Sequence, residues 1–429
     1  MFSLIVKRIL IVIFILNAFS CKKEKDELKP VLMLDSPYED QVFNVFDLIP
    51  ISGRVEDDSK IEFLRISLVN EEQKAVAPAI IIKPDENIYN FNEGIILDDT
   101  GLKSGTFYLI LTAYDGVNEK KLFRKILIVE SPRKKLGVFV ITSDGQSTKA
   151  EIIDSLGQVN FHTSFTGDYV GSSVSSYYQT LTVCGYRTGN INCINLKDKT
   201  IKWTVPSTNQ SYPTFTNLAY LNNLNYVSYF NGIIKAHGDN SLINVSFNSY
   251  DGFYPEDLLV IDDHLVSYQK SFSTPNKKLV AYNKNTGFFY HDLNVNYEVI
   301  DFCEKDGKEV LIFGNFENNG LLKIYNSEEN GQWEPVAMPI GKISCAKKLD
   351  QSTYMFSNNN GLYTYRYMPN GVLLFKAGDF SKFIYDDLNS QIIAVENNQV
   401  NYYNYPTGTL INSYSFSGNI KDIHIWYNK

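Results

Sequence analysis

Short apolar runs separated by clusters of Asp, Asn and Gly dominate the chain after its first 30 residues. Runs of about five to nine residues rich in Val, Ile, Phe and Tyr are typical of β-strands, and the clusters between them are typical of turns. Clear examples lie at 49–55, 106–114, 121–129, 309–314 and 391–395. Aromatic residues make up 14% of the chain, which also favours strands over helices. The pattern therefore predicts an all-β protein.

Residues 30–130 form the first predicted domain. About 100 residues of short strands divided by Asp/Gly turns are typical of a β-sandwich. The segments 52–58 (SGRVEDD) and 112–116 (TAYDG) resemble bacterial PKD-like and cadherin-like modules, so we expect an Ig-like sandwich here. A short basic linker, 131–135 (SPRKK), follows it.

The same resemblance suggests a metal. In calcium-binding relatives, carboxylates in such turns ligate the ion, and hard cations take oxygen ligands. Asp57, Asp58 and Asp115 are the corresponding residues here. Asp is also a common turn former, so a turn without calcium is the alternative, and no other cofactor is expected.

A turn motif recurs through residues 136–429. An aromatic residue or Ile ends a strand, and a polar residue, a turn and usually a Gly follow it. The second residue of the motif falls at 154, 195, 238, 283, 326, 368 and 404. Intervals of about 40 residues match a four-stranded propeller blade. The repeat predicts a seven-bladed β-propeller.

The two ends of this repeat complement each other. The first unit lacks an inner strand before 137–141 (GVFVI), and the chain finishes with a spare strand, 420–427 (IKDIHIWY). An open sheet edge invites aggregation. We therefore expect the C-terminal strand to complete the first blade and close the ring.

One unit carries a family resemblance. The run 281–290 (AYNKNTGFFY) is similar to the Ala-x-Asp-x-x-Thr-Gly-x-x-x-Trp repeat of PQQ-like propellers, with Asn in place of Asp and no Trp. That repeat is structural. The vicinal cysteines used by the quinone-binding enzymes of the group are missing here, so the resemblance implies no quinone.

The first 20 residues resemble a lipoprotein signal peptide. Lys7 and Arg8 precede an eight-residue apolar run, and small residues lead into Cys21. The run is too short to span a bilayer by itself, which needs about 20 apolar residues. The resemblance makes Cys21 the lipidated first residue of the mature chain; a simple secretion signal is the alternative. Residues 21–29 would then be a charged tether.

The tether contains Lys25-Asp26-Glu27, which resembles the surface-export tag of Bacteroidota lipoproteins; a generic spacer is the alternative. Taken whole, the chain is similar to Bacteroidota lipoproteins that carry a PKD-like module and a propeller. The resemblance implies the cell envelope, an outer membrane and possible surface exposure. Nucleic acid is not an expected partner, because the formal net charge is −8 and nucleic-acid affinity comes mainly from basic residues.

Cysteine and histidine give little sign of catalysis. A two-residue turn at Thr188-Gly189 would place Cys184 opposite Cys193, close enough for a disulfide, whereas a shifted turn would separate them. The five His show no metal spacing, and no nucleophile elbow or phosphate-binding loop is present. No catalytic residue is predicted.

Aromatic residues in long connections are the candidate ligand-binding residues. Propellers bind at the ends of their channel, and aromatic rings there can stack on sugars or anchor a protein. The connections after the first three units should emerge on one face and carry Tyr169, Tyr177, Tyr178, Tyr212, Phe253 and Tyr254. The alternative is that these rings cap the blade edges.

Three functions remain open from the sequence. The favoured one is a lipid-anchored, non-catalytic binding or scaffold protein that recognises a glycan or an envelope protein through the propeller face. A glycan-cleaving envelope enzyme, with acids at the channel mouth, is the second. A structural subunit of an outer-membrane assembly is the third.

Overall fold

The computed structural model describes residues 28–99, 101–208 and 211–429, and these residues contain strands and no helix. The all-β prediction is therefore confirmed for the described chain. Contacts divide the chain into two units, with the boundary between Pro132 and Arg133. The predicted signal, tether start and lipidation residue Cys21 lie outside the described residues.

The first unit consists of two sheets over one apolar core. One sheet has the order β1-β3-β6 and the other β2-β8-β7-β4-β5. Ile51 from the first sheet, and Ile66 and Leu109 from the second, are fully buried in the shared core. The strands are β1 (Val31–Ser36), β2 (Gln41–Asn44), β3 (Leu48–Glu56), β4 (Phe63–Asn70), β5 (Ile80–Ile82), β6 (Ile88–Ile96), β7 (Gly105–Tyr114) and β8 (Glu119–Val129).

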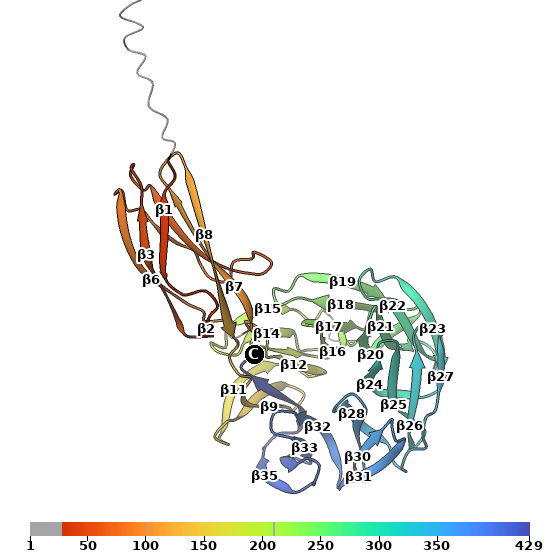
Figure 1. Ribbon diagram of the computed structural model, residues 1–429. Coiled ribbons are helices and arrows are strands. Elements are labelled where there is room, and N and C mark those ends of the chain that lie inside the picture. The colour runs from red at the N-terminus through yellow and green to blue at the C-terminus, as the bar shows by residue number, and fades with distance from the viewer. Residues whose placement is uncertain (1–27, 100, 209–210) are drawn as a thin grey trace, which may run out of the picture. The chain divides into compact units, whose positions relative to one another are not determined.

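The second unit is a β-propeller. Its described residues form seven four-stranded antiparallel sheets, whose first strands neighbour one another in the closed cycle β12, β16, β20, β24, β28, β32, β36. Figure 1 shows these sheets arranged around a common centre. The first strands are β12 (Gly171–Ser175), β16 (Phe215–Leu221), β20 (Phe253–Ile261), β24 (Glu298–Asp306), β28 (Ile343–Lys348), β32 (Phe380–Asp386) and β36 (Ile420–Tyr427).

The remaining strands follow outward from the centre in each sheet. The second strands are β9 (Lys135–Ser143), β13 (Thr180–Cys184), β17 (Leu224–Tyr229), β21 (His264–Ser271), β25 (Glu309–Phe316), β29 (Thr353–Asn358) and β33 (Gln391–Glu396). The third are β10 (Ser147–Asp154), β14 (Ile191–Asn195), β18 (Ile233–His237), β22 (Lys277–Asn283), β26 (Asn319–Asn326), β30 (Gly361–Arg366) and β34 (Gln399–Asn404). The outer strands are β11 (Val159–Thr166), β15 (Ile201–Val205), β19 (Ile243–Asn248), β23 (Phe289–Val295), β27 (Gly331–Trp333), β31 (Gly371–Ala377) and β35 (Leu410–Ser415).

The repeated turn has the same place in every sheet, between the third and the outer strand. Where the motif residue is Asp or Asn, its side chain closes the turn. Asn195 Oδ1 accepts the backbone N–H of Lys197, and Asn283 Oδ1 accepts those of Asn285 and Thr286. Asn and Asp favour turns because they can make these local bonds. The periodic motif therefore marks one structural position rather than a binding site.

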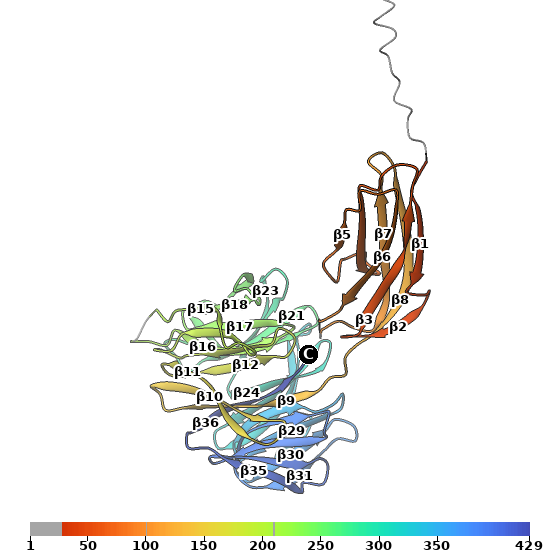
Figure 2. The same cartoon turned by 90° about the vertical axis from the view of Figure 1, so that its left-hand side faces the viewer.

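The C-terminal strand joins the start of the unit. β36 pairs antiparallel with β9, with Ile423 opposite Val140 and Ile425 opposite Val138. Figure 2 shows β36 in one sheet with β9, β10 and β11. The predicted pairing of residues 420–427 is present, and it covers the edge of a strand whose residues 138–141 are fully buried.

Candidate functional site

Polar residues of the first strands meet at the centre of the propeller. In five of these strands the pairing register shifts immediately before a polar residue, and a bulge of this kind re-aims a side chain. The residues are Asn217, Asp257, Asp301, Lys382 and Asp422. They line a cavity of about 400 Å³, together with Ser172, Lys347 and His424. This central cavity is one candidate site.

Asp301 and Lys347 form an ion pair within the cavity. Lys347 Nζ lies 3.2 Å from Asp301 Oδ1, and the backbone N–H of Ala346 donates to Asp301 Oδ2 at 2.8 Å. The charge of Asp301 raises the pKa of the Lys347 amine. The two groups therefore hold each other in place.

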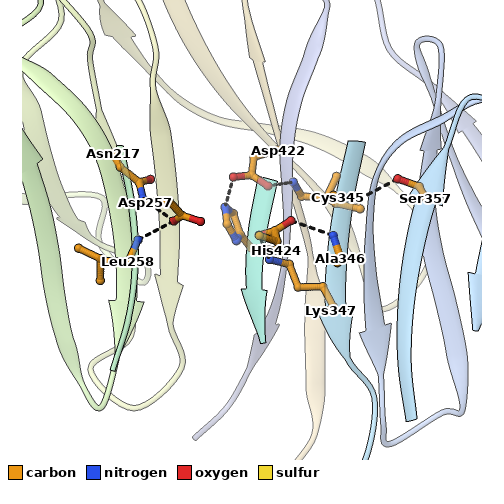
Figure 3. Close-up of polar contacts among 11 residues, drawn as sticks. Asn217, Asp257, Leu258, Cys345, Ala346, Lys347, Ser357, Asp422 and His424 are labelled. Carbon is orange, nitrogen blue, oxygen red and sulfur yellow. Dashed lines mark hydrogen bonds and ion pairs between the residues drawn. The ribbon is translucent and has the colours of Figure 1, made fainter. Parts of the chain in front are cut away.

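Asp257 differs from Asp301 in its surroundings. Its Oδ1 accepts hydrogen bonds from Asn217 Nδ2 at 2.9 Å and from the backbone N–H of Leu258 at 2.8 Å (Figure 3). Burial, with a smaller effect from the charge of Asp301, raises the pKa of Asp257 to about 7. This carboxyl consequently exchanges a proton near neutral pH.

Asp422, His424 and Ser172 lie together but do not form a catalytic triad. His424 Nε2 lies 2.7 Å from Ser172 Oγ and 3.5 Å from Asp422 Oδ2. In a working triad the carboxylate binds the other ring nitrogen, Nδ1. Here serine and carboxylate contact the same nitrogen, so the histidine cannot relay a proton between them. Burial lowers the pKa of His424, which favours the neutral ring.

The remaining bonds of Asp422 complete this cluster. Tyr169 donates its hydroxyl to Asp422 Oδ2 at 3.1 Å, and the backbone N–H of Ile423 donates to Oδ1 at 3.0 Å. Burial opposes ionisation of Asp422, but the electrostatic effects of His424, Lys382 and Lys347, together with the hydrogen bond from Ile423, hold the pKa of its carboxyl below its usual range. Tyr169 is thus a supporting residue of the central cavity, and burial raises the pKa of its hydroxyl.

The predicted aromatic residues do not share one face, and this expectation is wrong. Tyr169, Tyr212, Phe253 and Tyr254 lie at or beside connections between sheets, but Tyr177 and Tyr178 lie in the hairpin between β12 and β13. A strand carries the chain from one end of its sheet to the other. Tyr177 and Tyr178 therefore lie at the opposite end from the connections. In the sequence they follow a five-residue strand that is mostly polar, so the pattern of apolar residues did not predict that strand.

We call the end of the propeller that carries the sheet-to-sheet connections the crossing face. The hairpins between second and third strands also emerge there, because the strands alternate in direction. Phe230, from one such hairpin, lies 4.8 Å from Tyr254 and 5.3 Å from Phe272 between ring centroids. Tyr254 and Phe272 are also 5.3 Å apart. Three aromatic rings from two neighbouring sheets thus form one cluster.

A cleft of about 600 Å³ adjoins this cluster. Aromatic and polar side chains line it, including Tyr212, Tyr229, Phe230, Asn231, Lys235 and Phe272. Tyr212 is 62% exposed and Phe272 is 49% exposed. Phe253, by contrast, is buried and packs edge-on against Tyr250. The aromatic cleft is the second candidate site, and of the predicted rings Tyr212 and Tyr254 belong to it or border it.

The predicted disulfide does not form. Cys184 and Cys193 are free and buried. Cys193 pairs with Thr182 and Cys184 with Ile191, so the register is shifted by two residues from the predicted one. The connecting loop is longer than a two-residue turn because it wraps around the Asp168 carboxylate, which accepts the backbone N–H groups of residues 186–189.

The three predicted calcium ligands lie in turns of the first unit. Asp57 Oδ1 accepts the backbone N–H of Ser59, and Asp115 Oδ1 accepts those of Val117 and Asn118. These are the local bonds of turn-forming aspartates. The described residues contain no group of three or more His, Cys, Asp or Glu side chains placed to hold a metal ion, and this includes Asp57, Asp58 and Asp115.

Comparisons with known proteins find distant structural likenesses. No family model and no curated protein matches the sequence. A quinoprotein alcohol dehydrogenase-like protein from Bacteroides thetaiotaomicron is 10% identical with a TM-score of 0.47, over 93% of this chain and 99% of that one. BamB from Moraxella catarrhalis is 10% identical with a TM-score of 0.40, over 67% and 80%. The WD40 β-propeller domain of Doa1 is 11% identical with a TM-score of 0.46, over 62% and 90%.

These likenesses give no information about either candidate site, because the sequence identity is low and each TM-score is below 0.5. Among the described residues no helix is long and apolar enough to cross a membrane.

The sequence interpretation missed the central cavity. Its signal was present: a polar residue followed by an apolar one recurs at 217–218, 257–258, 301–302, 382–383 and 422–423, once in each of five first strands.

Proposed function

We propose that the protein is a lipid-anchored, non-catalytic binding protein of the cell envelope that recognises a glycan through the crossing face of its propeller. The proposal includes an Ig-like module in the first unit and a seven-bladed ring closed by β36. The observation that carries it is the aromatic cleft, which is lined by the exposed rings of Tyr212 and of Phe272, the latter a member of the three-ring cluster.

The composition of the cleft favours a glycan over an apolar protein segment. A sugar has an apolar ring face, which can stack on an aromatic ring. It also has hydroxyl groups, which can form hydrogen bonds with polar groups of the cleft lining: the Asn231 amide, the Lys235 amine and the Tyr212 hydroxyl. A purely apolar partner would leave these polar groups without hydrogen bonds, which costs affinity.

One observation favours the enzyme alternative. Asp257, with its pKa of about 7, has the protonation behaviour of a general acid. Glycoside hydrolysis requires a second carboxyl group as base or nucleophile. Asp301 is held by Lys347, and Asp422 is held by Tyr169 and a backbone N–H. Because Asp301 and Asp422 are both engaged by other groups, neither is available as the base or nucleophile. This supports binding rather than cleavage. Incubation with any bound glycan, followed by product analysis, separates the two functions.

The experiment is a glycan array followed by titration of the best ligand into the full-length protein. Tyr212→Ala and Phe272→Ala each should weaken binding roughly tenfold, because a central aromatic contact is typically worth more than about 1 kcal/mol. Tyr177→Ala is the matched control, since Tyr177 is 59% exposed and lies at the opposite end of the propeller.

Two results would overturn the proposal. One is an array without any hit. The other is an equal loss of binding in the Tyr177→Ala variant. If the array is empty and a membrane protein instead cross-links to the crossing face, the structural-subunit alternative is favoured.

A further inference from the structure

In the central cavity an acid and a base of opposite charge each leave hydrogen-bonding atoms without a partner among the described residues, and we propose that the cavity binds a small zwitterion of the α-amino acid class. The two groups are the Asp257 carboxyl group, which the ammonium group of a ligand would hold in its ionised form, and the Lys382 amine. The site is separate from the aromatic cleft, so it goes beyond the proposed glycan recognition.

Asp257 has one oxygen left for a ligand. Asn217 and Leu258 both donate to Oδ1. Oδ2 accepts no hydrogen bond from any residue that the structure describes, although the side chain lines the cavity. Asp257 is only partly buried, so this oxygen is available to a hydrogen-bond donor that enters the cavity. An ammonium group supplies both the hydrogen bond and the opposite charge.

Lys382 is the matching cation. It also lines the cavity, and its Nζ donates no hydrogen bond to the described residues. Asp422 is the acid that most strongly favours its charged form. Both oxygens of Asp422, however, already accept hydrogen bonds, from Tyr169 and from Ile423. The three N–H donors of Lys382 therefore remain for a ligand carboxylate.

The other charged groups of the cavity are already engaged. Asp301 and Lys347 neutralise each other at 3.2 Å. His424 is bound to Ser172 and lies beside Asp422. Asp257 Oδ2 and the Lys382 amine are thus without a hydrogen-bonded partner among the described residues, and a ligand that carries both charges satisfies both at once.

The ring order places these two groups on different sides of the cavity. Asp257 belongs to β20 and Lys382 to β32, and β24 and β28 separate these strands in the closed cycle. A ligand that contacts both groups therefore lies between these two sides of the cavity. The cavity volume of about 400 Å³ falls in the range of small-molecule sites.

The cavity has an approach from the end opposite to the crossing face. Lys347, Ile384 and His424 line it and also line a second hollow that includes Lys348 and Leu349. Lys348 and Leu349 lie at the last residue of β28 and just after it, so this hollow opens where the first strands end. A ligand in the cavity and a glycan on the crossing face use different entrances.

The test is isothermal titration of the full-length protein with each of the twenty proteinogenic α-amino acids. We expect at least one to bind with a dissociation constant below about 1 mM. Asp257→Asn and Lys382→Met should each weaken it roughly tenfold or more, since each removes a charge-assisted hydrogen bond. Asp251→Asn and Lys149→Met change exposed residues elsewhere in the propeller and should leave binding unchanged.

The wild-type protein gives a second, independent readout. The N-acetyl derivative of the bound amino acid lacks the ammonium group, and its primary amide lacks the carboxylate. Both should bind at least roughly tenfold more weakly. The proposal is overturned if none of the twenty binds, or if both derivatives bind as well as the parent. The proposal is also overturned if Asp257→Asn and Lys382→Met, with folding verified by circular dichroism, bind the amino acid as tightly as the wild type does. None of these results affects the glycan proposal, because the aromatic cleft is unchanged.

Discussion

The Lys135 amine lies 2.6 Å from Asp386 Oδ2, and the Asp386 side chain is fully buried. Lys135 begins β9, at the start of the propeller, whereas Asp386 ends β32, near its C-terminal part. Tyr427, on the closing strand, donates its hydroxyl to Asp386 Oδ1 at 3.3 Å. One carboxylate therefore joins three segments at the place where the two ends of the unit meet.

Asp386→Asn should destabilise the propeller strongly. The substitution keeps the shape but leaves the Lys135 amine without its opposite charge, and breaking a buried pair in this way typically costs about 3–5 kcal/mol. Asp387→Asn is the control, because Asp387 is half-exposed and its pair with Arg133 should contribute less than about 1 kcal/mol. Chemical denaturation of the two variants measures the difference, and equal stabilities would contradict the assignment.

The same residue gives a pH dependence. Burial alone would raise the pKa of Asp386, but the bonds from Lys135 and Asn389 outweigh it and hold this pKa below its usual range. A lowered folded-state pKa contributes stability that is present above the unfolded-state value and is lost as pH falls. The difference in the free energy of unfolding between wild type and Asp386→Asn should therefore become smaller below about pH 4. A difference that grows on acidification would contradict this reasoning.

Removal of residues 420–429 should disrupt the propeller. Their loss uncovers the edge of β9 and exposes core residues that now pack against Ile423, which is 1% exposed. We expect a lower melting temperature and rapid proteolysis within residues 136–429. Removal of Lys429 alone, which lies outside β36, is the control and should have little effect. A truncated protein that melts like wild type would show that β36 does not hold the ring together.

The raised pKa of Asp257 predicts a dependence of stability on pH that is opposite to that of Asp386. The pKa of Asp257 is raised to about 7, so the folded state binds a proton that the unfolded state has already released. This stability is present below the unfolded-state pKa and is lost as pH rises through the folded-state value of about 7. The groups around it in the cavity are Asn217 on β16, Asp301 on β24, Lys347 on β28, Lys382 on β32, and Asp422 and His424 on β36.

Denaturation of wild type and Asp257→Asn at about pH 5 and about pH 8, on either side of the folded-state pKa, checks this prediction. The wild type should lose stability relative to the variant at the higher pH, because the amide introduced by the substitution does not ionise. A difference between the two proteins that stays constant between these pH values would place the pKa of Asp257 outside this interval.

The described cysteines should all react as free thiols after unfolding. Cys184, Cys193, Cys303 and Cys345 are buried, and burial raises the pKa of each thiol. Alkylation of the folded, non-reduced protein should therefore be slow, and alkylation in denaturant should label all four. A peptide map that shows Cys184 linked to Cys193 would contradict the observed register.

Much of the propeller could be predicted because its turn chemistry repeats. Asn195, Asn283 and the other Asp or Asn residues at this position make similar side-chain hydrogen bonds within their turns, so the same residue types recur in the sequence. The central cavity was harder to find, because each first strand contributes only one or two residues to its polar lining and carries other polar residues elsewhere. The register at Cys184 depends on a distant group, the Asp168 carboxylate, which no local pattern around Thr188 reveals. Tyr177 was misplaced for a related reason, since the strand before it is short and polar.

The most direct test of the account is a hydrogen-exchange footprint of the full-length protein with its best glycan ligand. The proposed function predicts protection in the segments around Tyr212, Phe230, Tyr254 and Phe272, with residues 176–179 unchanged. Protection confined to residues 176–179, or no protection anywhere in the propeller, would contradict recognition through the crossing face.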